Sequence, residues 1–168
     1  MEQKWHTDVL GAPFEQKTLP LGRDEEGAIF ATLVRSLPAP ESSKPLSDVD
    51  ILYVHGWSDF FFRAGIAQYF NDLGARFYAL DLRKYGRSLR PRQTPGYIDD
   101  LKKYDIDIAA ALREMKTQEG GRKLILMRHS TGGLVLTLWA SRHSSRAAAL
   151  ILNSPWFEFQ TGKAAATL

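Results

Sequence analysis

The sequence predicts an α/β fold in which a mostly parallel sheet carries helices on both of its faces. Two observations predict it. Short continuous apolar runs such as Ile51–Val54 are typical of strands buried on both faces, and segments with helical spacing of apolar residues lie between them. From residue 50 onward the two patterns alternate along the chain. Such alternation is typical of parallel strands joined by crossover helices.

The strands are expected where apolar and β-branched residues gather in short segments. Residues 5–21 mix apolar and polar side chains with two prolines, which predicts one or two short strands, and residues 28–37 are rich in Ile, Phe, Thr and Val. Residues 37–48 hold three prolines and three serines and are expected to form a surface connection. Four more strands are expected: at 51–54, within 75–82, at 124–127 and at 147–152.

Three helices are expected between the later strands. They lie within residues 62–74, with Gly74 as a C-cap, within residues 99–121, ending at Gly120 and Gly121, and at 132–141. The apolar residues with helical spacing in the first two are Phe62, Ile66, Tyr69, Phe70 and Leu73, then Leu101, Tyr104, Ile108, Leu112 and Met115.

Composition excludes several classes of protein. The chain has no cysteine, which excludes disulfides, thiolate catalysis and thiolate metal sites. Its 22 Lys and Arg against 19 Asp and Glu leave a net charge of +3, too balanced for nucleic-acid binding. No window holds the ~18 apolar residues of a membrane span, and residues 1–19 lack the apolar core of a signal peptide. We therefore expect a cytoplasmic protein without a transmembrane segment.

One stretch with many glycines and prolines concentrates positive charge. Its basic residues are Arg83, Lys84, Arg87, Arg90 and Arg92. We interpret the stretch as a solvated loop. The alternative is a patch for anionic head groups or phosphates.

The sharpest functional signal is the stretch KLILMRHSTGGLVLTLW, residues 123–139. It places Ser130 between an expected strand and an expected helix, where a hydrolase carries its nucleophile on a strained turn. Gly132 lets the strand and the helix pass closely after the serine, whereas Arg128 stands where a small residue is expected before it. The alternative is that Ser130 only caps the helix.

Two further motifs follow expected parallel strands in the same way. The sequence His55-Gly56-Trp57 follows the strand at 51–54, and the segment from Asp81 to Ser88 follows the next strand. Ligand sites in such sheets form at the carboxyl ends of the strands. We therefore expect these two motifs to lie beside Ser130.

These ordered motifs resemble the α/β-hydrolase family, in particular its serine aminopeptidase and monoacylglycerol lipase or lysophospholipase-like subgroup. LYVHGWSD is similar to the first catalytic-loop segment, FYALDLRKYGRS to the family's DLRGHGRS loop, and LMRHSTGGL to its GHSxGG elbow. The resemblance implies that residues 1–168 are the N-terminal portion of a single α/β-hydrolase domain. They would be a truncated core without the last strands and the lid.

The resemblance also implies roles for individual residues. Ser130 matches the nucleophile, and the backbone amides of Trp57 and Thr131 match the two oxyanion-hole donors. Phe60 and Trp156 are candidates for substrate contact. The resemblance gives three other residues structural roles rather than a place in the triad: His55, His129 and Asp81.

The triad acid and base are not found at the expected places. After Ser130 the sequence holds one histidine, His143, and one carboxylate, Glu158. His143 is expected at the far end of the helix that Ser130 opens, roughly 20 Å away at about 1.5 Å per residue. Glu158 falls where the lid would begin.

The resemblance thus implies a serine hydrolase of carboxylic esters, of lipid or other acyl type, that needs no cofactor and no metal. The alternative is an inactive hydrolase-fold protein with at most a binding role, and as a free-standing chain we expect low stability and little turnover. A third interpretation, a phosphate- or nucleotide-binding domain, lacks both glycine-rich phosphate motifs.

Overall fold

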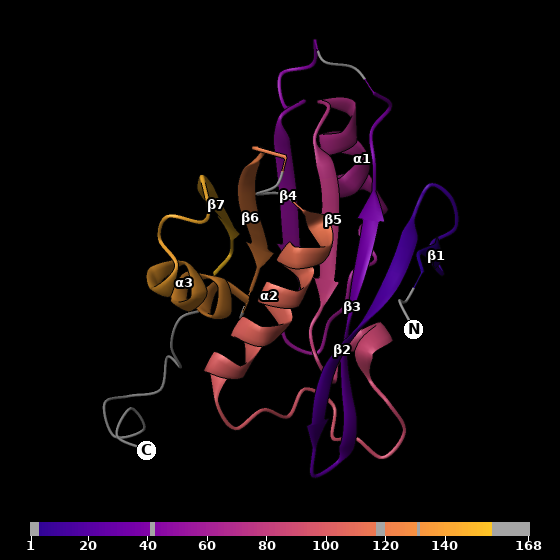
Figure 1. Ribbon diagram of the computed structural model, residues 1–168, viewed down its shortest axis with the longest axis vertical. Helices are drawn as coiled ribbons and strands as arrows, with labels where there is room; N and C mark the ends of the chain where they lie inside the picture. The colour runs from indigo at the N-terminus through magenta and orange to yellow at the C-terminus, as the bar shows by residue number, and fades with distance from the viewer. Residues whose placement is uncertain (1–3, 41–42, 117–119, 131, 156–168) are drawn as a thin grey trace.

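The computed structural model describes residues 4–40, 43–116, 120–130 and 132–155. In this part of the chain a seven-stranded sheet is flanked by three helices (Figure 1). The elements are β1 (His6–Thr7), β2 (Glu15–Asp24), β3 (Gly27–Ser36), β4 (Val49–Val54), α1 (Ala64–Asp72), β5 (Arg76–Asp81), α2 (Tyr104–Met115), β6 (Lys123–His129), α3 (Gly132–Arg142) and β7 (Ala149–Asn153). Two short 3₁₀ turns lie at Gly86–Ser88 and Leu101–Lys103.

The sheet has the order β1-β2-β3-β5-β4-β6-β7. Strands β5, β4, β6 and β7 run parallel to one another, and β1, β2 and β3 join the sheet by antiparallel pairing. In the register of the central strand, Leu52 lies opposite Tyr78 on one side and Leu126 on the other. Every residue of β4 is buried, as its continuous apolar sequence predicts. The expected α/β class is therefore confirmed.

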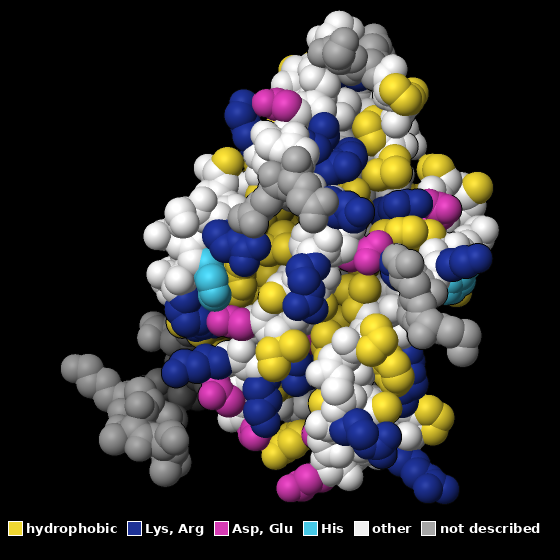
Figure 2. Space-filling view, viewed as in Figure 1, with side chains coloured by type: hydrophobic (Ala, Val, Ile, Leu, Met, Phe, Trp, Pro, Cys, Tyr) yellow, Lys and Arg dark blue, Asp and Glu magenta, His cyan; other side chains and the backbone are white. Residues whose placement is uncertain are grey.

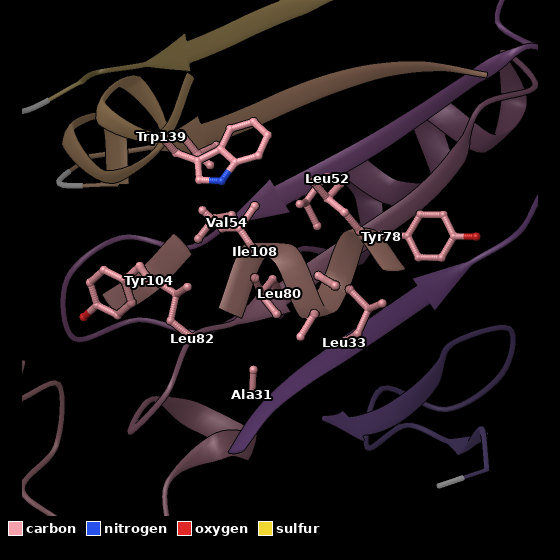
Figure 3. Close-up of a cluster of buried hydrophobic side chains, with 14 of the residues drawn as sticks. Ala31, Leu33, Leu52, Val54, Tyr78, Leu80, Leu82, Tyr104, Ile108 and Trp139 are labelled. Carbon is pink, nitrogen blue, oxygen red and sulfur yellow. The ribbon is translucent and has the colours of Figure 1, made fainter. Parts of the chain in front are cut away.

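The side chains of β4 alternate between two apolar cores, one on each face of the sheet. Ile51 and Tyr53 pack beneath α1, whereas Leu52 and Val54 pack on the opposite face, beneath α2 and α3. Figure 3 shows this second core, in which Ile108 of α2 and Trp139 of α3 meet the strands. Helices thus cover both faces of the sheet, and the carboxyl ends of β4, β5 and β6 border a cavity.

Most expected boundaries agree with the structure to within two or three residues. Gly74 has φ +94° directly after the C-cap of α1, as expected, and its amide donates to the Asn71 carbonyl at 2.9 Å. Helix α2 instead ends at Met115, five residues before the glycine pair, because Lys116 adopts the left-handed conformation with φ +53°.

The basic stretch between residues 83 and 92 is neither a solvated loop nor a free cationic patch. The side chains of Arg83, Lys84 and Arg87 are largely buried, and each forms ion pairs inside the protein. Their carboxylate partners are Asp107 for Arg83, Asp24 and Glu26 for Lys84, and Asp8 and Asp81 for Arg87. On the face seen in Figure 2, Lys and Arg are dispersed among apolar and acidic side chains. Both interpretations were therefore wrong for Arg83, Lys84 and Arg87, whereas Arg92 is exposed, as expected of a solvated loop.

Lys84 ties the turn between β2 and β3 to the loop after β5. Its ammonium group lies against Glu26 and lowers the pKa of that carboxyl to about 2, mainly through the side-chain hydrogen bond. A carboxyl with a lowered pKa stabilises the folded state above its ordinary pKa, and this contribution is lost as the pH falls from about 4.5 toward 2.

We expect the Lys84→Met substitution to raise the pKa of Glu26 part of the way to its ordinary value, because the hydrogen bonds from Thr94 still lower it. An NMR titration of the side-chain carboxyl would measure this change. Lys103→Met, which removes the ion pair with Asp99 instead, serves as a control that leaves the Glu26 titration in place. An unchanged Glu26 titration in Lys84→Met would show that the lysine is not the cause.

Candidate active site

The three motifs from the sequence meet at the carboxyl ends of β4, β5 and β6. Ser130 lies between β6 and α3 with φ +57°, a left-handed conformation that is strained for a serine. Its amide donates to the Asn153 carbonyl at 3.1 Å, and its carbonyl accepts from the Gly133 amide at 2.7 Å. The turn therefore has the sharp strand-to-helix geometry that exposes a nucleophile in hydrolases.

The loop after β4 lies directly against this turn. A Cβ atom placed on Gly56 would be 3.3 Å from the Cβ of Ser130 and 3.8 Å from its Oγ. The absence of a side chain at Gly56 therefore lets the backbone of residues 55–57 approach the serine. The Trp57 side chain is 65% exposed beside this approach. The other expected oxyanion residue, Thr131, lies outside the described residues, as does Trp156.

His55 is buried next to Ser130, and both of its ring nitrogens are already used. Its Nε2 accepts a hydrogen bond from the Leu82 amide at 3.1 Å, so the proton is on Nδ1, which donates to the Gly56 carbonyl at 2.7 Å. Burial lowers the pKa of the imidazole and keeps it neutral. His55 therefore joins the loops after β4 and β5 and is not free to take a proton from Ser130.

His143 lies at the other end of α3, one residue after the helix ends. Its ring stacks on Trp139 with centroids 4.6 Å apart, and its Nδ1 is 2.9 Å from the Trp139 carbonyl. No histidine or carboxylate of the described ranges forms a hydrogen bond with Ser130 Oγ. The serine thus has the turn of a nucleophile without a base beside it in this part of the protein.

Asp81 holds the loop after β5 in place. Its Oδ1 accepts from the Phe61 amide at 2.9 Å, and its Oδ2 accepts from the Arg87 amide at 3.1 Å and from Arg87 Nη1 at 2.9 Å. Gly86, directly before Arg87 in this loop, has φ +41°. A Cβ atom on it would be 2.4 Å from the Cβ of Phe60, so this position has no room for a side chain. The carboxylate therefore fixes the loop that forms one side of the site.

A large apolar cavity of about 530 Å³ lies beside this turn. It is lined mainly by apolar and aromatic residues: His55, Gly56, Trp57, Leu82, Tyr85, Ile98, Leu101, Tyr104, Arg128, Leu134 and Val135. Phe60 lies elsewhere, on a smaller cavity of about 190 Å³ on the other side of Trp57. Phe61 is fully buried in the core beneath α1, where it packs against Tyr53 and Phe77.

Sequence reasoning missed most of the walls of the large cavity. Leu101 and Tyr104 were assigned to the inward stripe of the second helix, and Leu134 and Val135 follow Ser130 in a helix whose apolar residues all resemble core. The signal that could have found them is their position. Each lies at the start of a helix, next to the open strand ends.

Arg128 is a buried cation that lines this cavity. The side chain is 2% exposed, and its Nη2 donates to the His55 carbonyl at 2.7 Å. Its Nε and Nη1 have no hydrogen-bond partner among the described residues. Burial lowers the pKa of the guanidinium to about 9, so the group is still charged at neutral pH.

Gly132 makes room for Arg128. A Cβ atom on Gly132 would lie 1.2 Å from Nε and 1.4 Å from Cζ of Arg128. The guanidinium therefore occupies the space where a side chain at position 132 would be. The turn keeps its sharp geometry because the glycine after the serine, rather than a small residue before it, leaves room for the arginine.

We expect Gly132→Ala to lower the free energy of unfolding by about 1–3 kcal/mol, the usual cost of overpacking. In an Arg128→Ala background the same substitution should cost much less, because the space is then empty. Chemical denaturation of the four variants of this double-mutant cycle would measure the coupling, expected to exceed about 1 kcal/mol. Additive effects would contradict the steric relation between the two residues.

No group of histidine and carboxylate side chains in the described ranges could hold a metal ion. Within the same ranges, none of the helices combines the length and the apolar character that crossing a bilayer requires.

Comparisons with known proteins agree with this geometry. The chain is similar to 1-acylglycerol-3-phosphate O-acyltransferase ABHD5 of Sus scrofa, with 33% identity over 79 residues, which cover 47% of this chain and 22% of that protein. It is also similar to abhydrolase domain-containing protein lid-1 of Caenorhabditis elegans, with 26% identity over 148 residues, 85% of this chain and 37% of that protein. The chain thus spans well under half the length of these curated relatives.

Solved structures show the same fold at low sequence identity. A thermostable carboxyl esterase from Bacillus coagulans matches with a TM-score of 0.66 and 17% identity, over 83% of this chain and 43% of that chain. An epoxide hydrolase from Vigna radiata matches with a TM-score of 0.64 and 19% identity, over 92% of this chain and 45% of that chain. Residues 48–168 match the family described as serine aminopeptidase, S33. The chain therefore belongs to the S33 serine aminopeptidase family of α/β-hydrolases.

Proposed function

We propose that the protein is a serine hydrolase that cleaves carboxylic esters of lipid or other acyl type, with Ser130 as its nucleophile. The observation that carries the proposal is the position of Ser130 on a strained turn with φ +57°, next to Gly56 and the apolar cavity. Membership of the S33 family and the fold shared with an esterase support it.

In this proposal Ser130 Oγ attacks the carbonyl carbon of an ester. The Trp57 and Thr131 amides donate to the oxyanion as it develops, and each such donor is worth about 3 kcal/mol in known sites. This proposal assigns no residue as the general base, because no histidine of the described residues forms a hydrogen bond with Ser130 Oγ and because His55 and His143 have other partners. The apolar cavity would hold the acyl chain.

Labelling with a fluorophosphonate probe tests the nucleophile. We expect slow labelling of the 168-residue chain at Ser130, accelerated by added imidazole, which supplies the base from solution. Peptide mapping should place the label on Ser130, and Ser130→Ala should abolish it. Ser141→Ala is the matched control, since Ser141 lies on the surface of α3 with its hydroxyl bonded to the Leu138 carbonyl. Labelling that survives in Ser130→Ala, or no labelling even with imidazole, would reject the proposed nucleophile.

A second substitution tests the close approach of the loop after β4. We expect Gly56→Ala to slow labelling of Ser130 roughly tenfold, because the new Cβ crowds the serine and misplaces it. Gly65→Ala in α1 is the control, because a Cβ atom there meets nothing within 4 Å. Equal labelling rates in both variants would show that the approach at Gly56 has no role in the reaction.

The alternative function is a non-catalytic protein that only binds a ligand in the cavity. Two observations favour it: Ser130 has no base within hydrogen-bonding reach among the described residues, and a buried cation, Arg128, borders the cavity. Absence of labelling in the experiment above, with intact folding, would support this alternative.

A further inference from the structure

The large cavity contains a positive charge that no carboxylate of the described residues balances. Arg128 is the one cationic side chain among its lining residues, and none of the lining residues is a carboxylate. His55 is held neutral by burial. A buried guanidinium has five N–H donors, and among the described residues its one hydrogen-bond partner is the His55 carbonyl.

The nearest acidic groups are tyrosines, which do not supply the missing charge. Tyr85 and Tyr104 line the cavity with Arg128, and their rings belong to the core beneath α2. Burial raises the pKa of both hydroxyls, so both stay neutral at physiological pH. The nearby buried carboxylate Asp107 is paired with Arg83, and Asp81 is paired with Arg87.

We propose that the cavity binds a monoanionic amphiphile, a fatty carboxylate whose head group pairs with the Arg128 guanidinium and whose chain follows the apolar walls. In the structure Nε and Nη1 have no partner among the described residues and are closed to solvent, so the guanidinium turns toward the cavity to receive the head group. Leu82, Ile98, Leu101, Leu134 and Val135 provide the apolar surface for the chain. This binding does not depend on whether Ser130 reacts.

Charge and size select this class of ligand. One guanidinium balances one negative charge, and a carboxylate matches the planar donor group of an arginine. A phosphate monoester carries nearly two charges at neutral pH and would leave one of them unpaired in an apolar site. The cavity volume of about 530 Å³ falls within the range of roughly 300–1,000 Å³ found for small-molecule sites.

Isothermal titration of the Ser130→Ala chain with dodecanoate, below its micelle concentration, tests the proposal without any contribution from catalysis. We expect dodecanoate to bind roughly 10- to 100-fold more tightly than dodecanol, the value of a charge-assisted hydrogen bond in a buried site. Dodecyl phosphate is titrated in parallel and is expected to bind less tightly than dodecanoate.

Matched variants assign the binding to the cavity and to its cation. Arg128→Met should remove the preference for dodecanoate and leave dodecanol binding unchanged, whereas Arg35→Met, which removes a surface arginine paired with Glu15, should change neither. Leu134→Trp should weaken both ligands because the larger side chain fills the cavity. Circular dichroism and thermal unfolding confirm that each variant is folded.

Three results would overturn the inference. Equal affinity for dodecanoate and dodecanol would show that the cavity has no anion site. Unchanged dodecanoate binding in folded Arg128→Met would show that the anion site lies elsewhere. Tighter binding of dodecyl phosphate than of dodecanoate would show that the site prefers a dianion to a monoanion. None of these results depends on the labelling of Ser130, so this inference and the proposed function fail separately.

Discussion

Arg128→Met is expected to raise the free energy of unfolding by about 2–4 kcal/mol at pH 7, because it removes a buried charge without a counter-ion. Arg128 is 2% exposed, and Nε and Nη1 are unpaired among the described residues. Methionine keeps an unbranched, adaptable side chain in the same space. It gives up the hydrogen bond from Nη2 to the His55 carbonyl, which offsets part of the gain.

The direction of the pKa shift also predicts that removal of the Arg128 charge stabilises the folded state. Burial lowers the pKa of Arg128 to about 9, well below its ordinary value, so the unfolded chain binds the proton more tightly than the folded chain. The charged side chain therefore destabilises the folded state below about pH 9, and the penalty shrinks as the pH rises from there toward the ordinary pKa of an arginine. The difference between Arg128→Met and the parent chain should accordingly be largest at neutral pH.

Urea denaturation at pH 7 measures this gain, and thermal unfolding should show a rise in Tm of about 5–15 °C. Arg35→Met is the control: Arg35 is paired with Glu15 near the surface, so its removal should change stability by less than about 1 kcal/mol. A destabilised Arg128→Met chain would mean that the guanidinium has a partner in the folded protein.

Arg83→Met is expected to have the opposite effect, a loss of about 3–5 kcal/mol. Arg83 is buried, like Arg128, but it has a counter-ion. Its Nε and Nη2 donate to Asp107 Oδ1 at 2.8 and 2.6 Å. Asp107 is fully buried in α2. The substitution leaves this carboxylate with the Arg83 amide as its partner on the loop, and an amide does not neutralise its charge.

The double variant Arg83→Met/Asp107→Leu tests the cause. If the loss comes from an uncompensated carboxylate, removal of Asp107 in the Arg83→Met background should recover part of the stability, measured by the same denaturation. A double variant that is less stable than Arg83→Met would show that Asp107 stabilises the fold through other contacts.

Most of the framework was predictable from the sequence because it depends on local apolar patterns. The continuous run Ile51–Val54 predicts a central strand, and β4 is buried throughout. The turn at Ser130 was also predictable, since an apolar strand, a serine and a glycine before a helix-spaced segment specify it locally. Boundaries differ where a single residue takes a special conformation, as Lys116 does at the end of α2.

The charged interior was not predictable, because charge does not report burial. Arg87 pairs with Asp8, which lies 79 residues earlier, and Arg83 pairs with Asp107, which lies 24 residues later. Neither pair has a local pattern in the sequence, so the stretch resembled a solvated loop. For the same reason the sequence showed Arg128 only as an obstacle at the turn, and not as a cation that borders a cavity.

The fit between Arg128 and Gly132 limits which substitutions this chain can accept over evolutionary time. While arginine is present at 128, a side chain at position 132 on α3 overlaps the guanidinium and is accepted only if the arginine side chain moves. A smaller residue at 128 leaves Gly132 undisturbed. Mutational histories of this turn should therefore depend on order: loss of the arginine makes later diversification at 132 easier.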